Sequence, residues 1–323
     1  MTQMTRARRP TSADIPALLE ATVRHMMHQE AEVLDVTSET ITRGVSGAEV
    51  RRHTVGVRVP QGPDTVVSLV TKMSDRIERS TLAHLNAQGQ PGVPLSHAHD
   101  ADFDGPDWIC LQDLGDEGRP DVLSPLPDET LASEVTALAS IHAANAGDAG
   151  LDWLPPADRE YARSMIEDVF WRPHWEDAVT QNDFHEEFGA WLPRVEATAA
   201  KVVDEIAGLD ADDGSRTLVH TEINPGNVLV RGGRAYLIDW ADAHRGSLYL
   251  DLPHHLYTLE LAERYRQALD RAGLTIGRTD FEERYRVAAR YTALRTMWWT
   301  FEAWRDDRDA AEWVRHYFGM LEL

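Results

Sequence analysis

The chain has 323 residues, enough for two domains or for one two-lobed domain with a sizeable core. Its formal net charge of −22 disfavours nucleic acid and anionic membranes as partners, and it contains no run of 18 apolar residues that would predict a membrane span. The basic N-terminus is not followed by the apolar segment of a secretory signal, and the single cysteine, Cys110, excludes an intramolecular disulfide, so we expect a cytoplasmic protein.

The first third of the chain favours strands between two helices. Alternating or apolar runs rich in valine predict strands, and the Pro60–Asp64 stretch between two of them predicts a turn. Ser12 or Asp14 is the expected cap of the first helix, and Cys110 is the expected buried thiol of the last strand. The expected elements are a helix at 12–31, strands at 54–59 and 65–72, a helix at 75–88 and a strand at 108–114.

From Gly115 onward, helical patterns dominate, and Gly208 stands where a helix-ending glycine is expected. The expected helices are at 129–144, 159–170, 184–207, 257–272 and 281–304. A sheet-rich part therefore precedes a larger helical part, with the boundary near residues 113–118. The pattern predicts an α+β fold with two lobes, at 1–113 and 114–323.

A polar segment interrupts these helices. His220, Glu222 and Asn227 are closely spaced, and Asp239 follows an apolar hairpin-like stretch with a Gly-Gly turn. Strands at 227–230 and 235–238 would bring Asn227 and Asp239 together at one end of the hairpin.

This layout suits phosphoryl transfer. In kinases an acid orients the acceptor hydroxyl, while an Asn and a later Asp hold Mg²⁺, which prefers hard oxygen ligands. Glu222 would aim the hydroxyl at the γ-phosphate, Asn227 and Asp239 would bind Mg²⁺, and His220 would hold the loop from behind. The alternative is a polar turn between two strands, without chemistry.

The segment resembles the catalytic loop of the aminoglycoside phosphotransferase and choline kinase group, which has a protein-kinase-like fold. That loop usually reads His-Gly-Asp-x-x-Pro-x-Asn, followed by Ile-Asp-Trp or Ile-Asp-Phe. The matching positions are His220, Pro225, Asn227, Ile238, Asp239 and Trp240. The chain departs from the pattern at Thr221, in place of Gly, and at Glu222, in place of Asp. Asp251 matches an aspartate that is usually structural in the group. The resemblance is strong over 218–252 and weaker, in consistent order, elsewhere.

The resemblance implies that the N-terminal lobe binds a nucleotide. Lys72 would contact the phosphates with Glu78 as its ion-pair partner, although Glu78 suits the first turn of a helix as a solvated acid equally well. The small-residue loop with Ser46 and Gly47 would cover the phosphates, or it is an ordinary hairpin. The stretch from Gln112 to Leu114 would meet adenine through its backbone; the residue types do not distinguish ATP from GTP.

The C-terminal lobe is expected to bind the acceptor. The chain has 10 Trp, and Trp299 and Glu302 lie off the apolar face of their predicted helix. With Asp242, they would suit an ammonium group or a sugar ring, although core packing is the better expectation for any single Trp. The stretch His97–Asp102 is expected to be a polar inter-strand loop rather than a metal site.

The sequence thus predicts an ATP- and Mg²⁺-dependent O-phosphotransferase of a hydroxylated small molecule, as a monomer or homodimer. Its charge favours a cationic acceptor or a Mg²⁺-complexed nucleotide, although solubility alone explains it equally well. By resemblance the acceptor is an aminoglycoside or another antibiotic, an amino sugar or a nucleoside, which would imply antibiotic resistance. The alternatives are a nucleotide-binding pseudokinase, weakened because Glu222 replaces Asp, and a non-kinase protein that keeps only the fold.

Overall fold

The chain divides into two compact units, each assembled from separate stretches of sequence. The computed structural model describes residues 14–27, 29–41, 49–60, 62–118, 123–124, 126–147, 150–212 and 214–323. The first unit contains Met1–Arg119, Leu126–Ala137 and Gly226–Ala243, and the second contains Pro120–Pro125, Leu138–Pro225 and His244–Leu323. The predicted polar segment is therefore shared, because the chain passes from the second unit to the first at Gly226.

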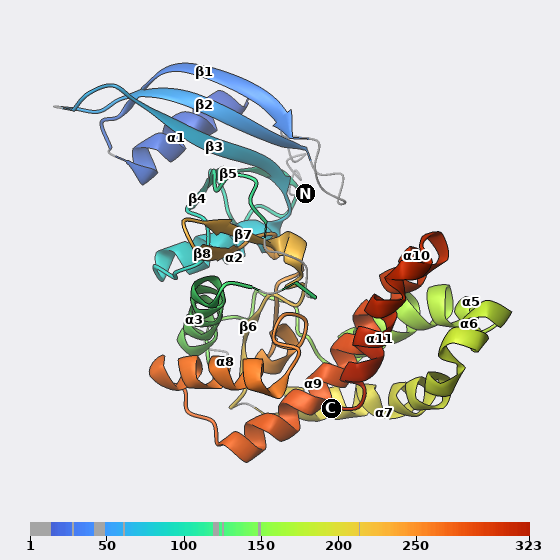
Figure 1. The fold of residues 1–323 in the computed structure, drawn as a ribbon. Helices are drawn as coiled ribbons and strands as arrows, with labels where there is room; N and C mark the ends of the chain where they lie inside the picture. Colours follow the sequence, from blue (N-terminus) through green and yellow to red (C-terminus); the bar gives the residue numbers. More distant parts are fainter. Residues whose placement is uncertain are drawn as a thin grey trace, which may run out of the picture. The chain divides into compact units, whose positions relative to one another are not determined.

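A five-stranded antiparallel sheet forms the centre of the first unit (Figure 1). Its spatial order is β1 (Glu32–Ile41), β2 (Val50–Arg58), β3 (Thr65–Ser74), β5 (Asp107–Gln112) and β4 (Ser96–Ala98). The strands predicted at 54–59, 65–72 and 108–114 are confirmed in kind as β2, β3 and β5, but their ends differ: β2 begins four residues earlier, and β5 ends at Gln112 instead of 114. The prediction of a loop at His97 is wrong, since His97 pairs with Cys110 inside β4.

Helix α1 (Ile15–Met26) covers one face of this sheet. Its apolar residues pack against β2, β3 and β5 in a core that includes Leu18, Val55, Leu69 and the fully buried thiol of Cys110. Burial raises the pKa of that thiol to about 12, so Cys110 behaves as a small apolar side chain. The expected cap Ser12 lies outside the described residues, and α1 ends five residues before the predicted end at 31.

Successive side chains of β3 point to opposite faces of the sheet. Leu69 points into the core beneath α1, whereas Lys72 has the opposite parity and points to the other face of the sheet. Helix α2 (Arg76–Ala87) follows, and its cap residue Asp75 accepts a hydrogen bond of 2.9 Å from the backbone N–H of Glu78.

A hairpin completes the first unit. Strands β7 (Val228–Arg231) and β8 (Arg234–Leu237) pair in register, as the sequence predicts. Gly232 and Gly233 have φ values of 58° and 76°, the conformation that a two-residue hairpin turn of this handedness needs. The N–H of Leu237 donates to the Gly92 carbonyl at 2.7 Å, which fixes the hairpin to the loop before β4.

The second unit is mainly helical. Its strands β6 (Arg216–Val219) and β9 (His244–Ser247) form a two-stranded antiparallel sheet. Helix α3 (Asp128–Ala144) begins in the first unit and ends in the second. The other longer helices are α4 (Arg159–Ser164), α6 (Asn182–Phe188), α7 (Leu192–Asp210), α8 (Leu259–Arg271), α9 (Arg278–Thr296), α10 (Trp298–Asp306) and α11 (Ala311–Met320). None of the helices formed by described residues is long and apolar enough to cross a membrane.

Several predicted helix ends are wrong. The helix expected at 159–170 changes after Ser164 into a π-helix, Met165–Trp175, in which Pro173 has no N–H to donate. The helix expected at 184–207 is interrupted by a 3₁₀ turn, Gly189–Trp191. Gly208 does not end a helix, because the buried Leu209 extends the apolar face of α7 past it.

The helix expected at 281–304 is also divided, at Met297 between α9 and α10. The hydroxyl and the N–H of Thr300 both donate to the Met297 carbonyl, at 2.6 and 3.0 Å. A threonine side chain that bonds a nearby carbonyl competes with regular helix geometry, which explains the break.

Candidate functional site

Three charged side chains meet on the face of the sheet opposite α1. Lys72 Nζ lies 3.0 Å from Glu78 Oε1 and 2.5 Å from Asp239 Oδ1. Ser74 Oγ donates to the other oxygen of Glu78 at 2.7 Å. The ion pair expected between Lys72 and Glu78 is therefore confirmed, and Asp239 joins it from a position 167 residues away in the sequence.

Burial and charge act in opposite directions on this cluster. Burial alone would lower the pKa of Lys72, but the carboxylates of Glu78 and Asp239 outweigh it, so the pKa is raised and the ammonium stays charged. The pKa of Glu78 is raised, because its almost complete burial outweighs the attraction of Lys72. Lys72 therefore provides a charged ammonium group whose position is fixed by Glu78 and Asp239.

Asn227 and Asp239 are brought together by the hairpin, as predicted. The N–H of Ile238 donates to the Asn227 carbonyl at 2.9 Å, directly beyond the paired residues of β7 and β8. Asp239 has φ of 64°, a left-handed conformation that turns its side chain toward Lys72. The buried Trp240 supports this turn by donating its ring N–H to the Leu237 carbonyl at 3.1 Å.

The donor set at this end of the hairpin fits Mg²⁺. Asn227 offers an amide oxygen and Asp239 a carboxylate, both hard ligands, and Mg²⁺ commonly takes one or two such groups and completes its shell with phosphate oxygens and water. Within the described ranges, no cluster of three His, Cys, Asp or Glu side chains is arranged to hold a metal ion. A metal here would therefore depend on a bound nucleotide for further ligands.

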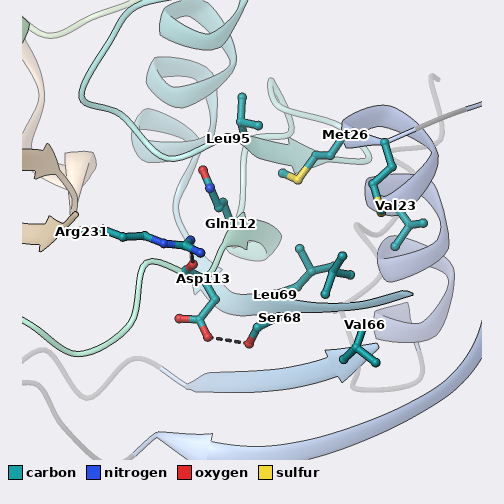
Figure 2. A pocket seen from close by; sticks show the side chains of 11 residues that line it. Val23, Met26, Val66, Ser68, Leu69, Leu95, Gln112, Asp113 and Arg231 are labelled. Carbon is teal, nitrogen blue, oxygen red and sulfur yellow. Dashed lines mark hydrogen bonds between the residues drawn. The ribbon is translucent and has the colours of Figure 1, made fainter. Parts of the chain in front are cut away.

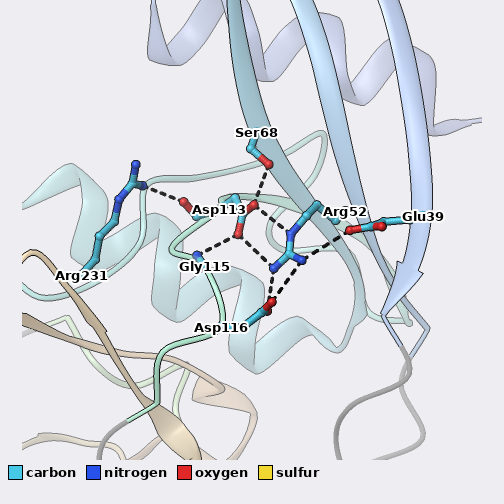
Figure 3. A network of polar contacts seen from close by, with 7 residues as sticks. All are labelled: Glu39, Arg52, Ser68, Asp113, Gly115, Asp116 and Arg231. Carbon is cyan, nitrogen blue, oxygen red and sulfur yellow. Dashed lines mark hydrogen bonds and ion pairs between the residues drawn. The ribbon is translucent and has the colours of Figure 1, made fainter.

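The stretch after β5 is held by a polar network that the sequence did not suggest (Figure 3). The Asp113 carboxylate accepts hydrogen bonds from Arg52 Nε at 2.9 Å and from Ser68 Oγ at 2.6 Å. Arg52 also pairs with Asp116 at 2.6 Å and with Glu39 at 3.4 Å. Burial would raise the pKa of Asp113, but the Ser68 and Arg52 contacts hold it below its usual range.

Backbone groups in the stretch that is predicted to meet adenine already form hydrogen bonds within the protein. The N–H of Gln112 donates to the Leu95 carbonyl at 2.8 Å, and the Asp113 carbonyl accepts from Arg231 at 2.7 Å. Gln112 pairs with Leu69 across the sheet, so its side chain lies on the α1 face rather than on the Lys72 face. There it lines a mostly apolar pocket of about 300 Å³ between α1 and β3 (Figure 2). The buried Leu114 follows, at the end of the stretch.

In the second unit, Asp251 holds the loop that carries His220 and Glu222. Its two carboxylate oxygens accept the backbone N–H groups of His220 and Thr221, each at 2.7 Å. His142 Nε2 lies 3.1 Å from the same carboxylate, and its Nδ1 lies 2.7 Å from the Tyr265 hydroxyl. Burial would raise the pKa of Asp251, but these hydrogen bonds lower it below its ordinary value, so the group is a buried carboxylate.

His220 lies behind the loop, as the sequence predicts. It is fully buried, and its Nδ1 accepts from the N–H of Glu222 at 3.3 Å. Glu222 itself is 52% exposed, and Arg295 Nη2 lies 3.8 Å from its Oε1. Between them Thr221 has φ of 66°, a conformation that favours glycine. His142, Tyr265 and Arg295 were not predicted as site residues, because each lies far along the chain from the loop and belongs to no local motif.

The remaining predicted site residues are distributed over both units. Trp299 packs edge-on against Trp313, with ring centres 5.2 Å apart, and Glu302 Oε1 lies 3.6 Å from His174 Nδ1. Asp242 belongs to the first unit, in the 3₁₀ turn Trp240–Asp242. Ser46 and Gly47 fall outside the described residues.

The fold is that of known small-molecule kinases. The structure is similar to spectinomycin phosphotransferase in complex with ADP and spectinomycin, with a TM-score of 0.53, 14% identity and coverage of 90% of this chain and 92% of that chain. It is also similar to choline kinase from Cryptosporidium parvum, with a TM-score of 0.55, 10% identity and coverage of 95% and 94%. For ethanolamine kinase from Plasmodium vivax the values are 0.54, 9%, 89% and 82%. The predicted α+β, kinase-like fold is confirmed.

Sequence comparison identifies the family. No curated protein matches the sequence significantly. The family model for phosphotransferase enzymes, in contrast, matches residues 40–289, which is most of the chain. The matched range includes Lys72, the loop that carries His220 and Glu222, and Asp251. The chain therefore belongs to the phosphotransferase enzyme family.

Proposed function

We propose that this phosphotransferase uses MgATP to phosphorylate a hydroxyl group of a small, cationic molecule. The observation that carries the proposal is the cluster of Lys72, Glu78 and Asp239, in which two carboxylates hold the partly buried, charged lysine at 3.0 and 2.5 Å. The two carboxylates keep the ammonium group of Lys72 charged and in place, and phosphate oxygens are a natural ligand for such a cation.

Residues of the first unit would bind the nucleotide. Lys72 would contact its phosphates, Glu78 would hold Lys72, and Asn227 and Asp239 would bind Mg²⁺. Magnesium, when bound, neutralises the charge on the phosphate oxygens. The loop with Ser46 and Gly47 and the backbone of the stretch from Gln112 to Leu114 remain the proposed contacts for the phosphates and the base.

Residues of the second unit would orient the acceptor. The half-exposed Glu222 carboxylate would accept a hydrogen bond from the acceptor hydroxyl and take its proton, while His220 and Asp251 keep the loop rigid. The acceptor oxygen forms a bond to the γ-phosphorus as the bond from that phosphorus to the β–γ bridging oxygen breaks, and ADP leaves. Such transfers depend more on positioning than on a strong base, so Glu in place of Asp suits the role.

The proposed acceptor is a hydroxylated amine. The net charge of −22 would attract a cation, and Asp242, Trp299 and Glu302 are side chains that suit an ammonium group. Choline and ethanolamine, named for two proteins of similar fold, are small molecules with a hydroxyl group and a positively charged nitrogen, and spectinomycin is named for a third. Aminoglycosides, other antibiotics, amino sugars and nucleosides are therefore the acceptors to test, with a role in antibiotic resistance if an antibiotic is the substrate.

The test is to incubate the protein with MgATP, or with MgGTP in parallel, and a panel of these acceptors, and to measure ADP or GDP and phosphorylated product. Asp239→Ala should abolish turnover, and Glu222→Ala should lower kcat by about 10²–10⁴-fold. Asp204→Ala is a suitable control, since it removes an exposed acid that pairs with Arg159 at the surface. Wild-type turnover by Glu222→Ala would contradict the role of Glu222.

The alternative function is a nucleotide-binding pseudokinase. It predicts that MgATP binds, measured by calorimetry, and that no acceptor in the panel is phosphorylated. An active Glu222→Asp variant of an otherwise inactive protein would identify Glu222 as the reason.

A further inference from the structure

Arg295 lies in the last turn of α9 and contacts Thr221 and Glu222 in the loop after β6. Its Nη1 donates to the Thr221 carbonyl at 2.6 Å, and its Nη2 lies 3.8 Å from Glu222 Oε1. The guanidinium also lies over the Tyr161 ring, 5.6 Å from the ring centre. The arginine side chain is only 9% exposed, so these contacts are made away from bulk water.

The position of this guanidinium is set by groups other than Glu222. The Thr221 carbonyl fixes one end of it, and the face of Tyr161 fixes its plane, because a cation is attracted to the face of an aromatic ring. Tyr161 is in turn packed against the ring of His244, with centres 4.2 Å apart. A planar fork held in this way presents its remaining N–H groups in a fixed direction.

Glu222 has a particular need for such a partner. It has one more rotatable bond than the Asp expected at this position, and 52% of its side chain is exposed, so packing restricts its conformation less than that of a buried acid. A cation at 3.8 Å restricts where one carboxylate oxygen lies, and the distance is long enough that the group is not sequestered in a tight ion pair.

We propose that Arg295 is a positioning residue that holds the Glu222 carboxylate in the orientation that receives the acceptor hydroxyl. The proposal rests on the function proposed above and extends it: an arginine on α9 compensates for the longer acid. Arg295 touches neither nucleotide nor acceptor in this scheme and acts through Glu222.

The first test compares two arginines of the same helix. Arg295→Met should lower kcat by about 10²-fold, the loss expected when a catalytic group is misplaced by about 1 Å, while KM for MgATP changes less than about threefold. Arg290→Met is the matched control, because Arg290 also lies on α9 but pairs with Glu205, at 2.9 Å, and should leave kcat unchanged. Arg295→Lys keeps the charge and should retain more activity than Arg295→Met.

A double-mutant cycle separates positioning from general support of the fold. In the Glu222→Asp background the shorter side chain no longer reaches the guanidinium, so adding Arg295→Met should cost less than about threefold in kcat. Equal losses in both backgrounds, with Arg290→Met unaffected, would show that Arg295 supports only the Thr221 turn and would overturn the proposal. If Arg295→Met does not fold, Arg295→Lys carries the same cycle.

The outcomes also distinguish this inference from the proposed function. An active wild-type protein with an inactive Glu222→Ala variant and a fully active Arg295→Met variant would refute the role of Arg295 alone. Full activity of Glu222→Ala would refute the role of Glu222 in catalysis, and the proposal about Arg295 with it.

Discussion

Thr221 combines a β-branched side chain with a left-handed backbone, two properties that rarely occur together. Its φ of 66° is imposed by Asp251, which accepts the N–H groups of both Thr221 and His220. A Cβ atom in this region of backbone space costs about 1–2 kcal/mol. The resemblance to a loop with Gly at this position therefore has a physical basis, and the chain tolerates Thr because the buried carboxylate holds the turn.

This strain leads to a prediction about two small substitutions. Thr221→Gly and Thr221→Ala both remove the hydroxyl and methyl groups, but only Ala keeps the Cβ. We expect the Gly variant to be more stable than the Ala variant by about 1 kcal/mol, the reverse of the usual order. Urea unfolding of both variants measures the difference, and a more stable Ala variant would show that the turn relaxes.

Asp251 determines a second prediction, on pH. Its pKa is lower in the folded protein than the ordinary value of about 3.9, so its carboxylate stabilises the fold above that pH, and the contribution is lost as the pH falls through the folded value. Asp251→Asn, which keeps one acceptor oxygen but turns an NH₂ donor toward the second backbone N–H, should cost about 3 kcal/mol at pH 7.

The free energies of unfolding of the wild type and Asp251→Asn should differ by a constant amount from about pH 7 to pH 5 and converge below about pH 4. The control is Asp204→Asn, an exposed position with 66% of its side chain accessible, where the difference should be small at all pH values. A difference that grows on acidification would contradict the assignment of a buried carboxylate.

The packing of the β7–β8 hairpin depends on the close approach of Gly92 to α3 and to β8. Gly92 has φ of 72°, and a Cβ atom there would lie 2.4 Å from the Cβ of Ala137 and 3.2 Å from the Ala235 carbonyl. Its own carbonyl holds β8 through the N–H of Leu237. The loop before β4, the middle of α3 and the hairpin therefore pack this closely because residue 92 has no side chain.

Gly92→Ala should consequently destabilise the protein by more than the backbone strain alone, by about 2–4 kcal/mol in total. Gly89→Ala is the matched control, because Gly89 has a similar φ of 65° but no atom within 4 Å of the position of an added Cβ. Thermal unfolding of both variants measures the excess, and equal melting temperatures would show that the packing around Gly92 yields easily.

The ends of several helices could not be predicted from local sequence patterns, in contrast to the hairpin. Turn chemistry such as Gly232-Gly233 is local, so the hairpin was predictable to within a residue. The break at Met297 and the passage of α7 through Gly208 depend on side-chain hydrogen bonds and on buried partners elsewhere in the fold. Such competition between local preference and packing is not visible in periodicity.

For the whole molecule, the charge of −22 leads to a prediction about acceptor binding. If the acceptor is cationic, long-range attraction should lower its KM at low ionic strength, and salt should weaken this effect as the screening length falls to about 8 Å at 0.15 M. KM for a cationic acceptor should therefore rise several-fold between about 10 mM and 300 mM NaCl, while KM for a neutral hydroxylated analogue stays constant. Equal salt dependence for both would indicate that the charge serves solubility.

The α+β class, the kinase-like fold and the residue types of the loop could be predicted from the amino-acid sequence, because they depend on local patterns and on residues with few chemical alternatives. The loop pattern singled out Asn227 and Asp239 as candidate residues, and the family resemblance implied an ion pair between Lys72 and Glu78, which the structure contains. The distant residues that hold these groups in place could be found only in the folded protein. Asp251 and His142 hold the loop, Arg295 lies beside Glu222, and Arg52 binds Asp113 after β5. Each of these contacts joins residues far apart along the chain, and no local sequence pattern indicates that such residues meet.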